Sequence, residues 1–573
     1  MKSSTSTKAG LTRRQFIVST AAGGGLLLGF SLPLVSRLAR ATGTHAVSTA
    51  ATVNAWIRIG SDESITVLVG SSEMGQGVIS SLPQIVAEDL MVDWSRVTGM
   101  HAPPDPAFVN PGTGLQLTGG SMSVRGYYGA LRTAGAAARD MLIAAAANAW
   151  NVDPSACTAP GNGTVVHTVD GRVATYGTLA SAAALLTPPV NPVLVPDAQL
   201  RLIGTSVARP DLPSKVDGSA IFGIDATTPN MLYAVIRHCP SIGGTVTITP
   251  ATPVGARAVV LLGNAVAVVV AGDTWQAIQA ANELQVTWSI PPSSAALSTD
   301  QIFLQAQQLL TAGSPVVAET HGDVAAALAG AAHRLDLTYD VPYLAHATLE
   351  PMNCTASVTP THCEIWAPTQ APGFVLSTAA ALTGLSPSQI TVHTTFLGGG
   401  LGRKFELDYV TQAILVSQAV HAPVKLTWER EEDFSNDQYR PMALVRVRAG
   451  LNAAGNVTAW AYRNVSPSIL FQRGWIGPND VDSQAVDGAT ELAYGTVRVL
   501  DDEGRALGPW APQLEPQPLR SGLRAMMKTR FFDARMLIAQ RQKKISFYMG
   551  CLGEEAIATA HGNAPLHPVD QCV

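Results

Sequence analysis

The segment GGGLGRK at residues 398–404, together with the turn TQAP at residues 369–372, decides the fold that this sequence predicts. Four of the five positions from 398 to 402 are glycine, and an apolar run typical of a strand precedes them at residues 390–397. Glycine has no Cβ, so a glycine-rich backbone can lie close to a bound group and offer it N–H donors. The segment is either a cofactor-binding loop or a plain glycine-rich turn, and the glycines alone do not separate the two.

Further motifs flank this loop in a definite order. The segment YLAHATLEP at 343–351 comes first, EIWAPTQAP at 364–372 comes next, and PVKLTWEREED at 423–433 follows the glycines. In this order they resemble the large, molybdopterin-binding subunit of the xanthine dehydrogenase and aldehyde oxidase family, in particular its exported branch of the isoquinoline 1-oxidoreductase beta type. The resemblance implies a mixed α+β fold of molybdenum-cofactor-binding domains of the aldehyde oxidase type, an α/β hammerhead domain and a helical, foreign C-terminal tail.

The resemblance also places the domain boundaries. It assigns a Tat signal peptide to residues 1–45, the N-terminal part of the second molybdopterin-binding domain to 50–190, the hammerhead domain to 200–290, the first molybdopterin-binding domain to 300–495, and a foreign fragment to 496–573. The sequence pattern agrees with mixed secondary structure throughout. It predicts strands at 53–59 and 64–69, and an Ala-rich helix from 130 to 150.

Composition narrows the class of protein further. The chain has 573 residues, of which 47% are hydrophobic and 14% charged, so it is long enough for several domains with large buried cores. Its formal net charge of -5 argues neither for a nucleic-acid partner nor for an anionic membrane surface. None of its six cysteines forms a C-x-x-C pair, so we expect no iron–sulfur cluster and no zinc site in this chain.

The N-terminus reads as an export signal. Two arginines at 13–14 precede an apolar, glycine-rich stretch at 17–35, and small residues at 39–41 suit a cleavage site. This pattern resembles a twin-arginine signal, which implies export through the Tat machinery to the periplasm. The alternative is an uncleaved anchor helix, which three glycines at 23–25 and Pro33 weaken.

Two more loops are candidates for contact with the cofactor. The segment EMGQG at 73–77 lies between a predicted strand and a predicted helix, where the first N–H groups of a helix favour an anion. The segment TGGS at 118–121 is a second loop of small and hydroxyl residues. The alternative for the segment at 73–77 is an ordinary start of a helix. The resemblance implies that the cofactor is held by Gly75, Gln76, Gly77, Thr118, Gly119, Gly120, Ser121, Gln370, Gly398, Gly399, Gly400, Leu401, Gly402 and Arg403.

Gln370 is the predicted catalytic residue. Its uncharged amide can donate an N–H without titrating, and the resemblance implies that it does so to an oxo group on molybdenum. The alternative is a polar turn residue. The family carries phenylalanine where this chain has Leu401, so the backbone N–H is kept but an aromatic wall is lost. His346 and Glu350 suggest an acid–base pair, yet the resemblance implies that this histidine only packs.

After about residue 495 the sequence changes character. Basic residues and helical apolar spacing replace the glycine-rich strands, and the segment resembles the N-terminal part of the alpha subunit of branched-chain 2-oxo acid dehydrogenases. Two unrelated genes thus meet here, by fusion or through deletion, frameshift or assembly error. The Gly-x-Gly-Glu motif that supplies the first family's catalytic base does not occur, so we expect a truncated and inactive chain.

The predicted function is therefore that of a molybdenum hydroxylase large subunit. It oxidises an aldehyde or an N-heteroaromatic substrate with oxygen from water, using molybdenum-molybdopterin in the cytosine dinucleotide form, with no metal ligand from the protein. We expect a small [2Fe-2S] subunit and an electron acceptor such as a cytochrome as partners. The alternatives are a non-catalytic remnant that binds cofactor or the small subunit, and a 2-oxo acid dehydrogenase alpha fragment.

Overall fold

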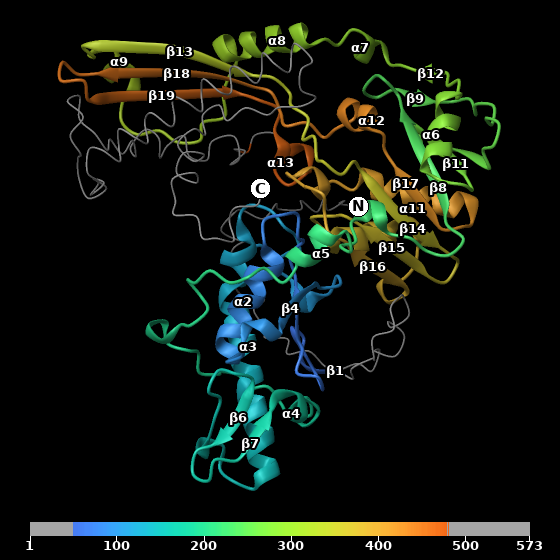
Figure 1. Ribbon diagram of the computed structural model, residues 1–573. Coiled ribbons are helices and arrows are strands. Elements are labelled where there is room, and N and C mark those ends of the chain that lie inside the picture. Colours follow the sequence, from blue (N-terminus) through green and yellow to red (C-terminus); the bar gives the residue numbers. More distant parts are fainter. Residues whose placement is uncertain (1–49, 478–479, 481–573) are drawn as a thin grey trace, which may run out of the picture. The chain divides into compact units, whose positions relative to one another are not determined.

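The computed structural model describes residues 50–477 and Asp480 (Figure 1). The predicted signal peptide and the predicted foreign fragment at 496–573 lie outside these residues. The chain divides into two compact units, the first comprising Met1–Pro315, Thr338–Arg446 and Arg463–Ser468, and this unit contains every predicted site residue. The described helices include none with the length and apolar character that a membrane span requires.

The first four strands form one sheet. Its order is β1 (Ala50–Asn54), β2 (Ile57–Gly60), β3 (Ile65–Val69) and β4 (Val97–His101), with β3 and β4 parallel. The single strand predicted at 53–59 is wrong, because β1 and β2 are an antiparallel pair in which Asn54 lies opposite Ile57. Alternation of apolar residues continues through so short a turn, and the pattern therefore concealed the reversal.

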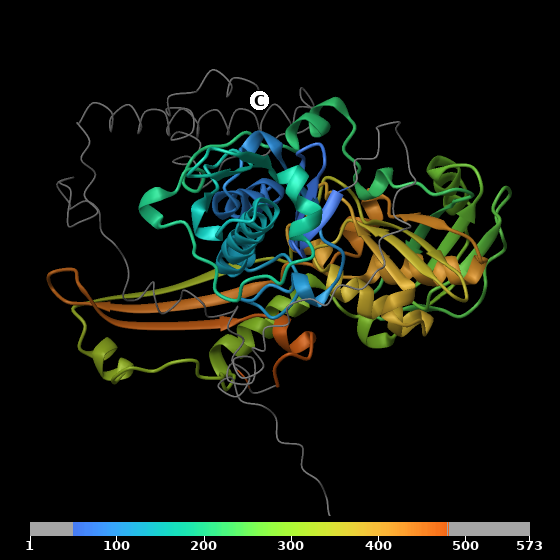
Figure 2. The same cartoon turned by 90° about the horizontal axis from the view of Figure 1, so that it is seen from below.

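Helices α2 (Val78–Leu90) and α3 (Met122–Trp150) pack against each other beside this sheet, in blue and teal in Figure 2. A Cβ on Gly135 of α3 would lie 2.4 Å from the Val86 carbonyl oxygen of α2, so the absence of a side chain allows the close approach. Helix α3 begins eight residues before the predicted start at 130, directly after the predicted loop at 118–121.

A small sheet and a fixed connection complete this part. Strands β5 (Cys157–Thr158), β6 (Thr164–His167) and β7 (Val173–Thr175) pair in that order, and α4 (Tyr176–Ala183) follows. The Pro-rich connection after α4 is fixed by hydrogen bonds from its backbone to two buried carboxylates. Glu88 accepts the N–H groups of Leu202 and Ile203, and Asp89 accepts that of Val195.

A mixed seven-stranded sheet forms the other large part of the first unit. Its order is β10 (Ala258–Leu261), β11 (Ala265–Val270), β8 (Leu232–His238), β17 (Val424–Thr427), β14 (Asn353–Val358), β15 (Cys363–Ala367) and β16 (Ile390–Thr394). The predicted hammerhead segment 200–290 and the predicted domain 300–495 contribute strands to this one sheet, which joins them through the parallel pair β17 and β8. Backbone hydrogen bonding thus crosses the boundary that the resemblance had implied between these two segments.

Helices cover both faces of this sheet. Helix α6 (Thr274–Asn282) packs on one face with Val235 and Val268, while α10 (Pro372–Thr383) and α11 (Asp408–Val420) pack on the other. Every residue of β11 is buried, because the strand is covered from both sides. The mixed α+β class predicted from the sequence is confirmed.

The remaining described helices and strands belong to none of the sheets described above. They are α5 (Leu212–Asp217), β9 (Thr245–Val246), β12 (Trp288–Ser289), α7 (Pro292–Ala295), α8 (Thr299–Ala312), α9 (Val324–Ala329), β13 (His333–Val341), α12 (Arg430–Ser435), β18 (Ala443–Leu451), β19 (Val457–Val465) and α13 (Ile469–Gln472). Strands β13, β18 and β19 form a three-stranded sheet, drawn as the long yellow-green and orange arrows of Figure 1.

Candidate functional site: four segments around Gln370

The edge of the seven-stranded sheet brings the two opening motifs together. Strands β15 and β16 are parallel neighbours, with Ala367 opposite Thr394 at their carboxyl ends. The turn with Gln370 leaves the first strand at that edge, and the glycine loop leaves the second. In open α/β sheets this edge is where ligands bind.

Gln370 connects three segments that are distant in sequence. Its backbone N–H donates to the Lys404 carbonyl oxygen at 2.8 Å. Its side-chain Nε2 donates to the Thr118 carbonyl oxygen at 2.9 Å, and its Oε1 accepts the Gly402 N–H at 3.0 Å. The side chain is buried, at 4% exposure. An amide nitrogen carries two hydrogens and Thr118 takes one, so a second hydrogen stays available for a ligand.

The loop at 73–77 joins the same assembly. The Ser72 N–H donates to Thr118 Oγ1 at 2.8 Å, and the Leu397 N–H donates to the Glu73 carbonyl oxygen at 3.0 Å. A Cβ on Gly400 would lie 2.6 Å from both Gln370 Oε1 and Met74 Sδ. The three glycine-rich segments therefore converge on Gln370. Their role in holding a cofactor stays a prediction.

The carboxylate of Glu73 caps the N-terminus of α2. Its Oε1 accepts the N–H groups of Gly75 and Gly77 at 2.9 and 3.0 Å, and its Oε2 accepts that of Ile79 at 2.9 Å. Gln76 is exposed, and its amide bonds to the backbone of the same loop. The N–H groups predicted to meet a phosphate at Gly75 and Gly77 are thus already taken within the protein.

Arg209 and Lys215 also contact this loop, and sequence reasoning missed them. Arg209 Nη2 lies 3.3 Å from Glu73 Oε1, and Lys215 Nζ lies 3.6 Å from the same oxygen. Both also pair with Asp211. Burial alone raises the pKa of Asp211, but these two cations outweigh it and lower that pKa to about 2. The spacing R-x-D-x-x-x-K at 209–215 was visible as a signal, but it lies in the predicted hammerhead domain, where no site residue was predicted.

Helix α3 begins without such a carboxylate. Ser121 occupies its N-cap at φ 54° and makes no capping bond, and its first turn contains no acidic residue. Gly120 is exposed, and the position where its Cβ would lie has only the Met122 Cγ in contact, at 3.8 Å. The start of this 29-residue helix is therefore the better place for an anionic group than the start of α2.

A buried histidine fixes the position of the Glu73 loop. His101 Nε2 accepts the Glu73 N–H at 2.9 Å, and its Nδ1 lies 3.0 Å from the Thr394 carbonyl oxygen. Because one nitrogen must accept and the other must donate, the ring is neutral with its hydrogen on Nδ1. Burial lowers the pKa of His101 to about 4, which agrees with this neutral form.

Glu350 holds the glycine loop by a hydrogen bond and an ion pair. Its Oε2 accepts the Gly398 N–H at 2.8 Å and pairs with the fully buried Lys404 ammonium, while its Oε1 accepts the Ile224 N–H at 3.0 Å. Burial lowers the pKa of Lys404 although Glu350 opposes the effect. The bonds to Gly398 and Lys404 hold the loop, and the bond to Ile224 occupies the other oxygen, so the geometry gives Glu350 no part in an acid–base pair.

Arg403 is placed differently from the prediction. Its side chain is fully buried, its two terminal nitrogens bind Asp408 at 3.0 and 2.8 Å, and its Nε lies 2.7 Å from Asp437 Oδ1. The guanidinium also lies 5.3 Å from the centre of the Trp428 ring. A cation held in this way anchors the base of the glycine loop and is not free to meet a phosphate.

Backbone strain concentrates at these loops. Leu401 has φ 54°, Ser121 also has φ 54°, and Ala347 has φ 52°, values that residues with a side chain seldom adopt. Strain of this kind is typical of functional sites. The Leu401 side chain is 69% exposed, so this residue presents an apolar surface at the loop.

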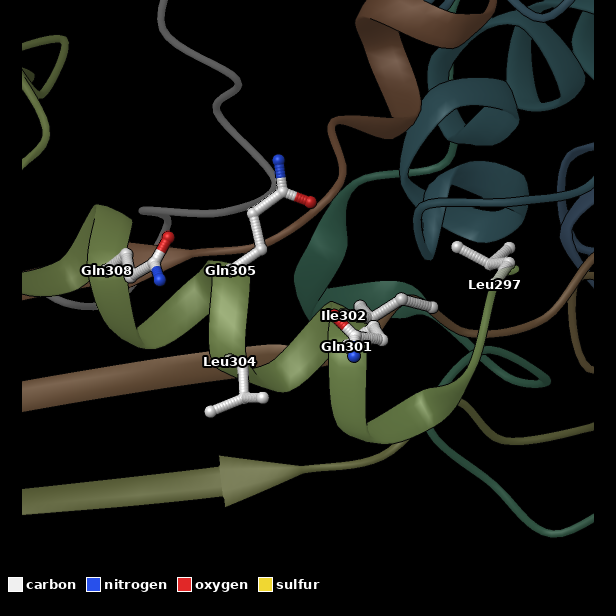
Figure 3. Close-up of a pocket in the computed structure, with 6 residues that line it drawn as sticks. All are labelled: Leu297, Gln301, Ile302, Leu304, Gln305 and Gln308. Carbon is white, nitrogen blue, oxygen red and sulfur yellow. The ribbon is translucent and has the colours of Figure 1, made fainter. Parts of the chain in front are cut away.

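A hollow on α8 takes no part in this arrangement (Figure 3). Leu297, Ile302 and Leu304 line it together with the three glutamines Gln301, Gln305 and Gln308. None of these side chains belongs to the predicted site. No group of three or more histidine, cysteine or acidic side chains that could hold a metal ion occurs in the part of the chain that the structure describes.

Several features fit an anionic, organic cofactor that the protein holds without metal ligands of its own. The start of α3 is open, Gln370 has an amide hydrogen to give, and the buried Ser72 hydroxyl has no hydrogen-bond partner among the described residues. Such an orphaned polar atom beside an open backbone suits a hydrogen-bonding ligand.

Comparison with known proteins agrees with this chemistry. Models described as molybdopterin cofactor-binding domains match residues 311–468 and 20–209. The chain belongs to the xanthine dehydrogenase and aldehyde oxidase family and carries its molybdopterin-binding domains. Within that family it is similar to the isoquinoline 1-oxidoreductase subunit beta of Brevundimonas diminuta, with 30% identity over 499 residues, 77% of this chain and 62% of the relative.

Two further relatives are informative. A membrane-bound aldehyde dehydrogenase of Gluconacetobacter polyoxogenes, named for pyrroloquinoline quinone, is 30% identical over 476 residues, 80% of this chain and 60% of the relative. The chain thus spans about 60% of the length of these two relatives. The C-terminal region is similar to the 2-oxoisovalerate dehydrogenase subunit alpha of Pseudomonas aeruginosa, with 51% identity over 134 residues, 23% of this chain and 31% of the relative.

The second resemblance inferred from the sequence is thereby confirmed. The aligned segment is longer than the stretch from 496 to 573, so the similarity extends further toward the N-terminus than the predicted junction. The whole stretch from 496 to 573 lies outside the described residues.

Proposed function

We propose that this chain binds molybdenum-molybdopterin, in the cytosine dinucleotide form, as the large subunit of a molybdenum hydroxylase. The proposal rests on one observation. Three glycine-rich segments converge on Gln370, beside the start of α3, where Ser121 makes no capping hydrogen bond. When bound, the cofactor supplies a metal centre that accepts electrons from the substrate and directs oxygen from water to it.

The chain's own residues hold and orient the ligands. Thr118, Gly119, Gly120 and Ser121 offer backbone and hydroxyl groups to the anionic part of the cofactor, where the α3 dipole favours negative charge. Gln370 directs its second amide hydrogen toward the reacting end. We place the substrate, an aldehyde or an N-heteroaromatic compound, at the exposed Leu401 side of the glycine loop.

The carboxylates at the loops do not serve as a general base. Glu73 accepts three backbone N–H groups, and Glu350 binds Gly398 and Lys404. A general base must be free to take a proton from the reacting group. We therefore propose that the chain binds cofactor and substrate but does not complete the hydroxylation unaided. A [2Fe-2S] subunit, a cytochrome as acceptor and Tat export to the periplasm are further parts of the proposal.

The test is to produce the full chain in cells that make the cofactor. Molybdenum is measured by mass spectrometry, and the pterin by fluorescence after oxidation. We expect both to accompany the protein, and we expect no dye-linked oxidation of aldehydes or N-heterocycles. Protein that contains neither molybdenum nor pterin contradicts the proposed cofactor. Turnover in the absence of any partner contradicts the proposed lack of a base.

A further inference from the structure

His346 and Asp437 form a pair that the proposed function does not use. Asp437 is buried, accepts the His346 backbone N–H, and places its Oδ2 3.1 Å from the ring Nδ1. A carboxylate only accepts hydrogen bonds, so Nδ1 carries the hydrogen and Nε2 is the atom left for another partner. Within the described residues, Nε2 has no hydrogen-bond partner.

The free nitrogen lies beside the glycine loop. His346 Nε2 is 3.6 Å from the position that a Cβ on Gly402 would occupy. The Gly402 N–H is the group that donates to Gln370 Oε1. One residue of the loop therefore lies between the imidazole and the predicted catalytic amide. The His346 side chain is 18% exposed, so a small molecule can reach it.

The segment that carries His346 runs along the loop. The Glu350 N–H donates to the Gly398 carbonyl oxygen at 2.9 Å, and a Cβ on Gly399 would lie 3.7 Å from the Leu349 nitrogen. Leu349 is 89% exposed and Leu401 69%, so each of the two segments shows an apolar side chain to solvent. Ala347, next to His346, holds a strained φ of 52°. An apolar rim with one oriented polar group is the usual construction of a small-molecule site.

We propose that His346 binds the hydrogen-bond acceptor atom of the substrate, a pyridine-type ring nitrogen or a carbonyl oxygen, and that Asp437 positions the imidazole. The inference rests on the proposed function and deepens it, because it names the residue that recognises the substrate. With a hydrogen on each ring nitrogen, the imidazole donates Nδ1–H to Asp437 and Nε2–H to the acceptor, and Asp437 is its counter-charge. The other charged groups around the pair are Arg403, which faces Asp437 Oδ1, and Asp433, which Arg430 pairs.

Binding of a matched pair of ligands tests this recognition without turnover. Equilibrium dialysis measures the binding of isoquinoline and naphthalene, which differ in one ring nitrogen, to the full chain. We expect the wild type to prefer isoquinoline. His346→Asn keeps an amide near the Nδ1 position but offers nothing at Nε2. It should weaken isoquinoline about tenfold, the usual effect of losing a hydrogen bond to a charged group, and leave naphthalene unchanged.

Two variants separate recognition from packing. His346→Gln places an amide near the Nε2 position and should keep part of the preference. His393→Asn is the matched control, because His393 also pairs with a carboxylate, Glu364, but on strands β15 and β16. It should leave both affinities unchanged.

The outcomes also separate this inference from the proposed function. Equal weakening of both ligands by His346→Asn, an unchanged preference in that variant, or a wild type that does not prefer isoquinoline overturns the role of His346. Molybdenum content, measured on the same samples, decides the cofactor assignment independently. Protein that contains molybdenum yet shows no preference contradicts only the role of His346. Protein that lacks molybdenum but recognises isoquinoline through His346 contradicts only the cofactor.

Discussion

Thr118 and Gln370 bind each other twice. The Thr118 N–H donates to the Gln370 carbonyl oxygen at 2.7 Å, and the Gln370 amide donates to the Thr118 carbonyl oxygen at 2.9 Å. The two residues are 252 positions apart in the sequence, yet this reciprocal pair aligns the start of α3 with the edge of the seven-stranded sheet. Each of the predictions below changes one part of the assembly that this pair holds together.

Gln370→Ala should destabilise the protein by about 1–3 kcal/mol, because it leaves the buried Thr118 carbonyl and Gly402 N–H without their side-chain partner. Urea denaturation measures the change in the free energy of unfolding. The control is Gln308→Ala on the exposed face of α8, which should change it by less than about 0.5 kcal/mol. Equal effects in the two variants would show that Gln370 does not link the loops.

Glu73→Gln should lower the free energy of unfolding by about 1–3 kcal/mol. The carboxylate is fully buried and shares Arg209 and Lys215 with Asp211, so an amide leaves these two cations with one carboxylate in place of two. It also removes an acceptor from the start of α2. The exposed Glu431→Gln serves as the control in the same denaturation experiment. A loss below about 1 kcal/mol contradicts the assignment of Glu73 as the cap of α2.

Gly400→Ala and Gly129→Ala should change stability in opposite directions. A methyl group at 400 meets Gln370 Oε1 and Met74 Sδ at 2.6 Å, so the loops must separate, at about 1–3 kcal/mol and with loss of bound molybdenum. At 129, on α3, nothing lies within 4 Å, and alanine favours the helix by about 0.5–1 kcal/mol. Thermal denaturation together with metal analysis measures both effects. Normal stability and metal content in Gly400→Ala contradict the close packing.

His101 should make stability depend on pH between about 6.5 and 4. The unfolded chain binds a proton at its ordinary pKa of 6.5, whereas burial holds the folded pKa at about 4. In this window the unfolded state binds more protons, so the free energy of unfolding falls as the pH falls, by up to about 3 kcal/mol, and the effect is complete below pH 4. His101→Gln can still accept from Glu73 and donate to Thr394, but it does not titrate. The difference in unfolding free energy between wild type and variant should therefore slope across this window; a flat difference contradicts a neutral, buried His101.

Much of the fold was predictable from local pattern. The alternation at 64–69 predicted a strand, and β3 covers Ile65–Val69. The Ala-rich run at 130–150 predicted a helix, and α3 contains this run and ends at Trp150. The tight turn between β1 and β2 was not visible, because alternation survives a reversal. The sheet shared by 200–290 and 353–427 was not visible either, because strand partners distant in sequence leave no local pattern.

The sequence predicted that the loops converge, but it did not predict which groups their N–H donors and the Arg403 side chain bind. Motif order placed Gln370 and the three glycine-rich segments at one site, and the hydrogen bonds agree. Glu73 takes the N–H groups expected to face a phosphate, and Asp408 and Asp437 take Arg403. Glu73, Asp408 and Asp437 compete with a cofactor for these donors, from four or five residues away or from more than thirty. The sequence does not show which acceptor lies near enough to bind, because the folded backbone sets these distances.

The contacts that align Thr118, Gln370 and the glycine loop run largely through main-chain atoms, whereas the Leu401 side chain extends into solvent from the middle of that loop. These main-chain contacts therefore do not depend on which side chain residue 401 carries. Exchange of that leucine for an aromatic or a small residue alters the lining that an incoming molecule meets without disturbing the scaffold beneath. Relatives could therefore diverge in the compounds they accept while keeping one common architecture.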